Sequence, residues 1–217
     1  MLARIIPALA LLLIACRGES PVPATRTAAQ EDSLARARQD SINRARPDYI
    51  VDSILPVEEE LRRFRAAIGG TPTTALTGGA TSREELLARV SAAVERRDTL
   101  ALQALALSAR EFADLVYLSS PNARPPYRQA PGFVWSQIEL RSRTGLRRLV
   151  ERRGGLPLAP LALRCGARAE AQGENRLYTD CVITRLGPRG DTLRELLFGS
   201  IIERGGRFKV VSYANQF

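Results

Sequence analysis

The residue types that most often carry out chemistry are scarce in this sequence. Its 217 residues include no histidine, which removes the commonest metal ligand and the usual general base near neutral pH. The three cysteines have none of the CxxC spacing of a redox centre or a zinc site. The sequence also lacks a glycine-rich phosphate loop and a Gly-x-Ser-x-Gly nucleophile motif. We therefore predict no catalytic residue, no metal site and no cofactor.

Two carboxylates remain as candidates for acid–base chemistry. Asp180 and Glu203 are each explained more simply as a charge on a strand face or beside a turn. In an alternative hypothesis, the protein is a small hydrolase or isomerase that uses a buried carboxylate such as Asp180 with a tyrosine. This hypothesis requires the two groups to meet in one concave pocket, where the pKa of the carboxylate would be raised.

Cys165 and Cys181 have the spacing of a disulfide across a β-hairpin. Apolar or small residues alternate with polar ones along two segments, 161–169 and 177–183, which are separated by the turn Gln172-Gly173-Glu174-Asn175. If the turn is centred on Gly173, the two cysteines are equally far from it and face each other, close enough for a bond between their sulfurs. Such a disulfide closes a loop of roughly 15 residues and contributes about 3 kcal/mol of stability.

The third cysteine, Cys16, lies in a different setting. Residues 1–15 hold one positive charge, Arg4, and then a short apolar run. The run is too short for a membrane-spanning helix, which takes about 20 residues, but it fits the core of a signal peptide. Its end, Leu13-Ile14-Ala15-Cys16, resembles the lipobox of bacterial lipoproteins. The resemblance implies cleavage before Cys16 and lipidation of its sulfur and its new amino terminus; the alternative is an ordinary secretory signal with a chance cysteine.

The lipobox resemblance implies a location and a domain plan. The protein is expected in the cell envelope, lipid-anchored and facing the periplasm, where disulfides form. Arg17 is not the aspartate that retains lipoproteins in the inner membrane of enteric bacteria, so the outer membrane is favoured.

Residues 16–47, rich in Ala, Arg, Ser, Thr and Pro, are expected to form a flexible tether with a helical stretch at 31–46. Residues 48–217 form a single predicted domain.

The net charge of +9 raises the question of a nucleic-acid or membrane-surface partner. The basic residues are almost all arginines, and they are scattered among acids, as in Arg62-Arg63 after Glu58-Glu59-Glu60. This pattern is typical of a solvated surface in an arginine-biased protein. We therefore predict no nucleic-acid partner.

Four helices are expected before the sheet. The first follows Pro56 and stops at Gly69-Gly70; the second opens with a capping box, Thr81-Ser82-Arg83-Glu84. Asp98 is expected to cap a third helix from Thr99 to about Leu118, which forms a helical hairpin with the second. The fourth spans about 133–153, and its Trp135 is interpreted as a core anchor, with a ligand platform as the alternative.

The last segment is expected to form a second hairpin, in which 192–203 pairs with 208–217 through the turn Gly205-Gly206. One face of it carries Leu197, Ile201, Phe208 and Val210, and the other carries Leu196, Phe198, Ile202, Val211, Tyr213 and Phe217. An antiparallel sheet usually exposes one face to water. We therefore expect the second face to be covered by a helix, a partner subunit or a bound apolar ligand.

The order of elements predicts an α+β fold, with N-terminal helices packed on a curved antiparallel sheet made of two C-terminal hairpins. With the closing run Gly206-Arg207-Phe208-Lys209-Val210-Val211-Ser212-Tyr213, this order resembles the NTF2-like (SnoaL-like, cystatin-like) cone. The resemblance implies a pocket between helices and sheet. The leading hypothesis is a non-enzymatic envelope lipoprotein that binds a protein partner, a second copy of itself or a small apolar ligand. The candidate binding residues are Tyr127, Trp135, Tyr178, Phe198, Val211, Tyr213 and Phe217.

Overall fold

The computed structural model describes residues 27–46, 55–187 and 189–215. Cys16, the predicted signal peptide and Phe217 lie outside the described residues. The chain divides into two compact units, Met1–Ser53 and Ile54–Phe217, and each is considered by itself.

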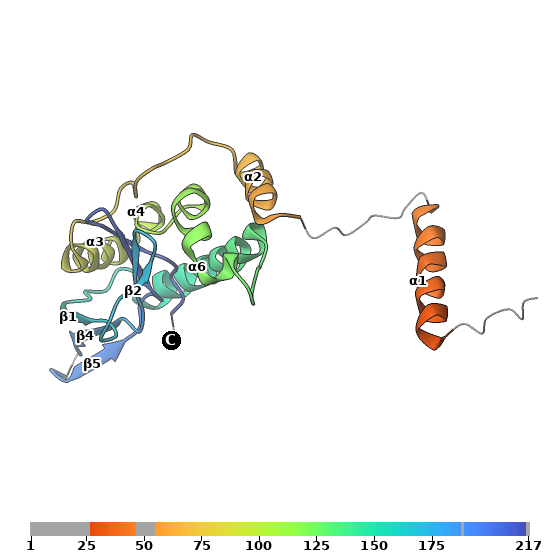
Figure 1. Ribbon diagram of the computed structural model, residues 1–217. Helices are drawn as coiled ribbons and strands as arrows, with labels where there is room; N and C mark the ends of the chain where they lie inside the picture. Colours follow the sequence, from red (N-terminus) through yellow and green to blue (C-terminus); the bar gives the residue numbers. More distant parts are fainter. Residues whose placement is uncertain (1–26, 47–54, 188, 216–217) are drawn as a thin grey trace, which may run out of the picture. The chain divides into compact units, whose positions relative to one another are not determined.

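The first unit contains one described helix, α1 (Ala28–Arg44), within the segment predicted as a tether (Figure 1). Thr27 begins it with a capping box, in which its hydroxyl accepts from the backbone N–H of Gln30 and the Gln30 side chain accepts from the N–H of Thr27. None of its residues is buried. The helix therefore rests on its cap and its intrinsic propensity rather than on a packed face.

The second unit confirms the predicted α+β class, with helices first and two antiparallel sheets after them (Figure 1). Its main helices are α2 (Val57–Ile68), α3 (Arg83–Glu95), α4 (Thr99–Ala104), α5 (Ala109–Glu111) and α6 (Pro131–Arg153). A π-helical turn, Phe112–Val116, and two 3₁₀ turns, Tyr117–Ser119 and Pro121–Ala123, lie between α5 and α6. The strands are β1 (Pro160–Arg164), β2 (Glu170–Gln172), β3 (Asn175–Tyr178), β4 (Val182–Leu186), β5 (Thr192–Glu195), β6 (Ile201–Arg204) and β7 (Arg207–Val210).

Helix α3 begins one residue later than the predicted capping box implies. Ser82, not Thr81, is the N-cap, and its hydroxyl accepts from the backbone N–H of Glu85. The Glu85 carboxylate in turn accepts from the backbone N–H of Thr81. The sequence offers two overlapping Ser/Thr-x-x-Glu patterns, and the one that places Leu86 and Leu87 in the core is used.

The single helix predicted from Thr99 to Leu118 is wrong, although Asp98 caps its start as expected. The chain leaves the helix at Leu105 and joins β7: the N–H of Val210 donates to Leu105 (2.9 Å) and the N–H of Leu107 donates to Val210 (2.8 Å). A second capping box, between Ser108 and Glu111, then restarts the helical path. Pairing with a distant strand therefore replaces helical structure over the four residues 105–108.

The first hairpin turns within the predicted segment 172–175, but its inner strands pair Gln172 with Asn175, which is one residue out of register with a turn centred on Gly173. The outer strands keep the predicted register. Leu163 pairs with Ile183 and Arg164 with Val182, which is the register that places Cys165 opposite Cys181. Its two halves belong to different sheets, however. The outer strands form a sheet of order β1-β4-β5, and the inner strands form a sheet of order β2-β3-β6-β7.

The predicted continuous strand 192–203 is therefore wrong. Thr192–Glu195 is β5 and pairs with β4, whereas Ile201–Arg204 is β6 and pairs with β3 and β7. The Gly205-Gly206 turn is confirmed between β6 and β7. The division follows from a β4–β5 hairpin, in which the N–H of Gly187 donates to Asp191 (2.7 Å), so the chain crosses between sheets at 196–200.

Both faces of the β6–β7 hairpin carry buried side chains, as the sequence predicts, and helices of the same unit cover them. Ile201 and Val210 face a core formed with α3, α4 and the end of α6. Ile202 faces a second core formed with Leu61 of α2 and Phe112 of the π-helical turn. The predicted face assignment is wrong for two residues, Phe198 and Tyr213. They lie in the first core because the chain has left strand geometry at both positions.

A buried ion pair ties the second core together. The Nζ of Lys209 donates to both carboxylate oxygens of Glu111, at 2.8 and 3.0 Å, and both side chains are at most 4% exposed. The same carboxylate accepts from the backbone N–H groups of Thr77 (2.8 Å) and Ser108 (2.9 Å). The buried charges are thus fully hydrogen-bonded, as burial requires.

Candidate functional site

A pocket of about 350 Å³ lies where α6, the α4–α5 connection and the chain after β7 meet. This volume is at the small end of the range for small-molecule sites, about 300–1,000 Å³. Three of the predicted binding residues line it: Trp135, Val211 and Tyr213. The remaining lining residues are Gln103, Ala106, Leu107, Ile138, Glu139, Ser142, Arg143 and Leu146.

The accessible apolar wall consists of Trp135, Ile138 and Val211, which are all half-buried. The indole of Trp135 lies with its ring centre 5.5 Å from that of Phe112, in a tilted arrangement. The inner side of Trp135 therefore packs on the second core, as a core anchor does, while the residue also borders the pocket.

The polar side of the pocket is formed by Gln103, Glu139, Ser142 and Arg143. Glu139 and Arg143 are exposed, and neither has an ion-pair or hydrogen-bond partner among the described residues. Because they are four residues apart on a helix, both charged groups can reach a ligand at the same rim. The pocket can thus hold an apolar body against Trp135, Ile138 and Val211, with a polar or charged group at the neighbouring rim.

Tyr213 supports the pocket rather than offering it a polar group. Its side chain is completely buried, and its hydroxyl donates to the carbonyl oxygen of Leu102 at 2.7 Å. Burial raises the pKa of the Tyr213 hydroxyl well above its usual value, so the group stays protonated. Its backbone passes so close to α6 that only glycine is tolerated at position 145, where a Cβ would lie 1.5 Å from the Tyr213 carbonyl oxygen.

The other predicted binding residues lie elsewhere. Tyr127 is exposed in the loop before α6, Phe198 is completely buried in the first core, and Phe217 lies outside the described residues. Tyr178 is half-buried on β3, and its hydroxyl donates to Glu203 (2.8 Å) while Arg83 stacks over its ring. Its pKa is raised by burial and by this contact with Glu203. The sheet residue Tyr178 is therefore bound to protein partners rather than facing the pocket.

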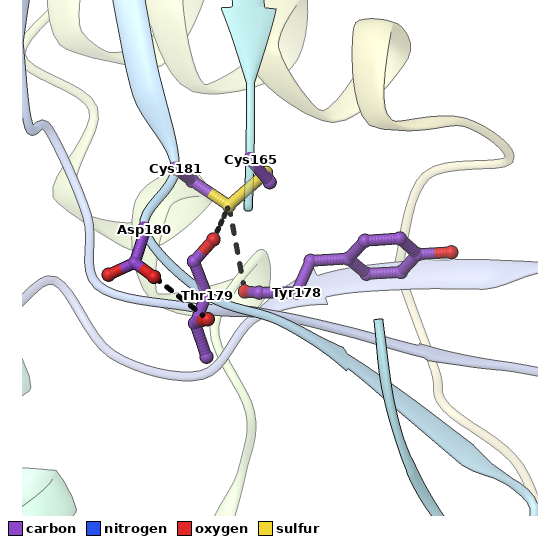
Figure 2. The surroundings of a disulfide bond; sticks show 5 residues. All are labelled: Cys165, Tyr178, Thr179, Asp180 and Cys181. Carbon is purple, nitrogen blue, oxygen red and sulfur yellow. Dashed lines mark hydrogen bonds between the residues drawn. A yellow bond between two sulfur atoms is a disulfide. The ribbon is translucent and has the colours of Figure 1, made fainter. Parts of the chain in front are cut away.

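The disulfide between Cys165 and Cys181 is present, with its sulfurs 2.10 Å apart (Figure 2). The Sγ of Cys181 also lies 3.5 Å from the carbonyl oxygen of Tyr178 and 3.7 Å from that of Thr179. A disulfide sulfur carries no proton, so these are packing contacts. Cys181 is completely buried in the first core, and the bond links the end of β1 to the start of β4, which are neighbouring strands of one sheet, at the point where the hairpin divides.

Asp180 lies beside the disulfide but not in a pocket. It is exposed, it does not line the pocket at α6, and Figure 2 shows its carboxylate pointing away from the ring of Tyr178. The carboxylate instead accepts from the hydroxyl of its neighbour Thr179 at 3.3 Å. The hydrolase or isomerase hypothesis requires Asp180 and a tyrosine to meet in one concave pocket. Asp180 does not meet this requirement.

Comparisons of the chain with protein-family models, with curated proteins and with solved structures found no match. Within the described part of the chain, no helix is both long and apolar enough to cross a membrane. Among the same residues, no group of three or more cysteine, aspartate or glutamate side chains is placed to hold a metal ion.

Sequence reasoning missed Gln103, Ile138, Glu139, Ser142 and Arg143 as site residues. On α6 a signal exists, because Trp135, Ile138, Glu139, Ser142 and Leu146 recur at helical spacing along the border of the buried stripe. The opposite wall has no such signal. It exists because the chain leaves the helix at Leu105, and that break depends on pairing with Val210.

Proposed function

We propose that this protein is a lipid-anchored binding protein of the bacterial envelope, which takes a small apolar ligand with a polar head into the pocket at α6. The observation that carries the proposal is that Trp135, Ile138 and Val211 line one pocket with Glu139 and Arg143, two charged residues without a partner among the described residues. A pocket between helices and sheet is also what the resemblance to the NTF2-like cone implies. The pocket region offers binding surface without an activated nucleophile, so the proposal is non-enzymatic.

The covered second face of the hairpin favours a ligand over a protein partner. From the sequence, this face could be covered by a helix, a partner subunit or a bound apolar ligand. Helices of the same unit cover it. A partner subunit is therefore not needed to bury Ile202. The half-buried apolar wall of the pocket is the surface that remains for a ligand.

The anchoring part of the proposal rests on Cys16. Several acyl chains hold a protein on a membrane stably, at about 0.8 kcal/mol for each buried methylene, whereas one chain holds it only marginally. Lipidation of Cys16 would keep the binding domain at the membrane, facing the periplasm. In that place the natural ligand is an amphipathic molecule that enters or leaves a membrane.

Trp135 provides a direct test, because it is the only tryptophan in the chain and lines the pocket. We expect titration with decanoate to shift and saturate its fluorescence. We expect Arg143→Gln to weaken decanoate binding about tenfold, since a hydrogen bond to a charged group is worth about 1.5–3 kcal/mol, and to leave binding of the uncharged alcohol decanol unchanged. The matched control is Arg147→Gln, which removes an exposed arginine of the same helix that does not line the pocket.

Three results would overturn the proposal. The first is the absence of saturable binding of either probe, and the second is equal weakening by both arginine substitutions. The third is binding that survives Ile138→Glu, a substitution that places a charge on the apolar wall.

A further inference from the structure

We infer that the outer face of α6 binds the surface of an anionic lipid bilayer directly, without the lipid on Cys16. This face is opposite the core side of the helix and consists of Phe133, Leu140, Arg141, Thr144, Arg147 and Arg148. The inference concerns a different surface from the pocket and requires neither the ligand nor the anchor.

Two of the three arginines on this face have no carboxylate partner in the described part of the chain. Arg141 and Arg148 are exposed, and neither has an ion-pair partner among the described residues. Arg147 has only a distant contact with Glu151, at 4.0 Å, with both side chains well exposed. Some other arginines of the unit are paired, as Arg65 and Arg110 are with Asp114. Guanidinium groups that lack a carboxylate are suited to bind phosphate, because their fork matches its oxygens.

Apolar side chains lie in the same stripe as these arginines. Phe133, Leu140 and Arg147 recur at every seventh residue, which is about two helical turns, so they lie in one line along the helix. Phe133 is 53% exposed and Leu140 is 68% exposed. In a water-facing helix such residues cost free energy, whereas at a bilayer surface they enter the region between headgroups and acyl chains.

A hollow beside this line is suited to a lipid headgroup. It has a volume of about 270 Å³ and is bordered by Leu140, Arg141, Thr144 and Arg148. Arg141 and Arg148 are two turns apart, so a phosphate can approach between them. The combination of free guanidinium groups with exposed Phe133 and Leu140 favours a lipid surface over a nucleic acid, which would leave Leu140 without a partner.

The test uses the full chain with Cys16→Ser, so that an acyl anchor contributes nothing. Sedimentation with vesicles of phosphatidylcholine and phosphatidylglycerol is compared with vesicles of phosphatidylcholine alone. We expect binding only to the anionic vesicles, and release in about 1 M salt, where the Debye length falls to about 3 Å. Replacing Arg141, Arg147 and Arg148 by Gln should lower the partition coefficient about a hundredfold, since each basic residue near an anionic surface contributes about fivefold. Leu140→Gln alone should lower it about fivefold.

The matched control replaces Arg164, Arg168 and Arg194 by Gln. These arginines are exposed in or beside the β1-β4-β5 sheet, so the control removes the same charge from another surface. We expect it to bind as the parent does. Equal loss in the two triple variants would overturn the inference, because binding would then follow net charge alone. Failure to bind anionic vesicles would also overturn it, as would an oligonucleotide that displaces the protein through the same three arginines. The decanoate titration is unaffected by these outcomes, because the three residues do not line the pocket.

Discussion

At the scale of single residues, the most informative side chain is Lys209, the only lysine in the chain. Burial disfavours the charged form of Glu111, but the hydrogen bonds from Lys209, Thr77 and Ser108 outweigh it, so the pKa of Glu111 lies below its usual 4.5. A buried pair of this kind adds little over an apolar pair of the same size, but breaking it on one side is costly.

We therefore expect Lys209→Met to lower the free energy of unfolding by about 3–5 kcal/mol at pH 7, because Glu111 would remain buried and charged without its partner. Urea unfolding followed by circular dichroism measures the loss. The control is Arg62→Met, which breaks a pair with Glu59 in which the arginine is 69% exposed, and which should cost less than about 1 kcal/mol.

The pH dependence of this loss has a definite sign. In the natural protein the folded pKa of Glu111 is lowered, so its contribution is present above the unfolded pKa and is lost as the pH falls through the folded pKa. In Lys209→Met, burial without a counter-charge raises the folded pKa, and protonation then favours the folded state. The difference in stability between the two proteins should therefore shrink as the pH falls from 7 toward 4. A stability difference between the two proteins that is the same at pH 7 and pH 4 would contradict this role of Glu111. Other carboxylates, such as Asp114, are present in both proteins, so their contributions cancel in the difference.

Sequence reasoning at this scale succeeded where the partners are set by local spacing. Cys165 and Cys181 could be paired because the outer strands keep the register of a hairpin centred on Gly173, although the inner strands are shifted by one residue. The pair Glu111–Lys209 could not be predicted, since the two residues are 98 positions apart and meet only through the break after α4.

At the scale of elements, the contact between α6 and the chain after β7 depends on Gly145. A glycine inside a helix usually costs about 1 kcal/mol relative to alanine. Here the Cβ of an alanine would overlap the Tyr213 carbonyl oxygen, and the Gly145 carbonyl oxygen accepts from the side chain of Asn215 at 2.7 Å. Close approach therefore explains why a poor helix former occupies this position.

We expect Gly145→Ala to destabilise the unit by about 1–3 kcal/mol despite the better helix propensity, because the segment at Tyr213 must move away from α6. The same movement displaces Val211 and Tyr213 from the pocket, so decanoate binding should weaken as well. Thermal unfolding and the Trp135 titration measure the two effects. The control, Thr144→Ala, changes the neighbouring position of the helix and should alter stability by less than about 0.5 kcal/mol. A Gly145→Ala protein more stable than its parent would show that no close contact exists.

Elements with a strong local signal were predicted nearly to the residue, such as α6, which ends at Gly154. Elements whose ends depend on distant pairing were not. Thr99–Leu118 has the apolar spacing of one helix, yet Leu105 and Leu107 bond to Val210. Likewise, the apolar pattern of 192–203 does not reveal that β5 pairs with β4 while β6 pairs with β3. Gln103 was missed as a pocket residue for the same reason, since the wall to which it belongs depends on that helix break.

At the scale of the whole molecule, the proposals place two membrane contacts on one chain. The lipid on Cys16 would act through hydrophobic burial, which salt does not weaken, whereas the arginines of α6 would act through charge, which salt screens. The net charge of +9 adds a general attraction to anionic surfaces, and the outer face of α6 adds arginines that lie beside exposed apolar side chains. The two contacts can therefore be separated by their response to salt.

Fractionation of bacteria that carry out lipoprotein processing makes this separation measurable. We expect the natural chain to stay with the membranes after a wash in about 1 M salt, because several acyl chains bind nearly irreversibly. The Cys16→Ser chain should sediment with membranes at low salt and be released by the wash. Cys16→Ser combined with the three substitutions at Arg141, Arg147 and Arg148 should be released at low salt, since neither contact remains. Release of the natural chain by salt would contradict lipidation at Cys16. Salt-resistant binding of Cys16→Ser would show that some other part of the chain anchors it.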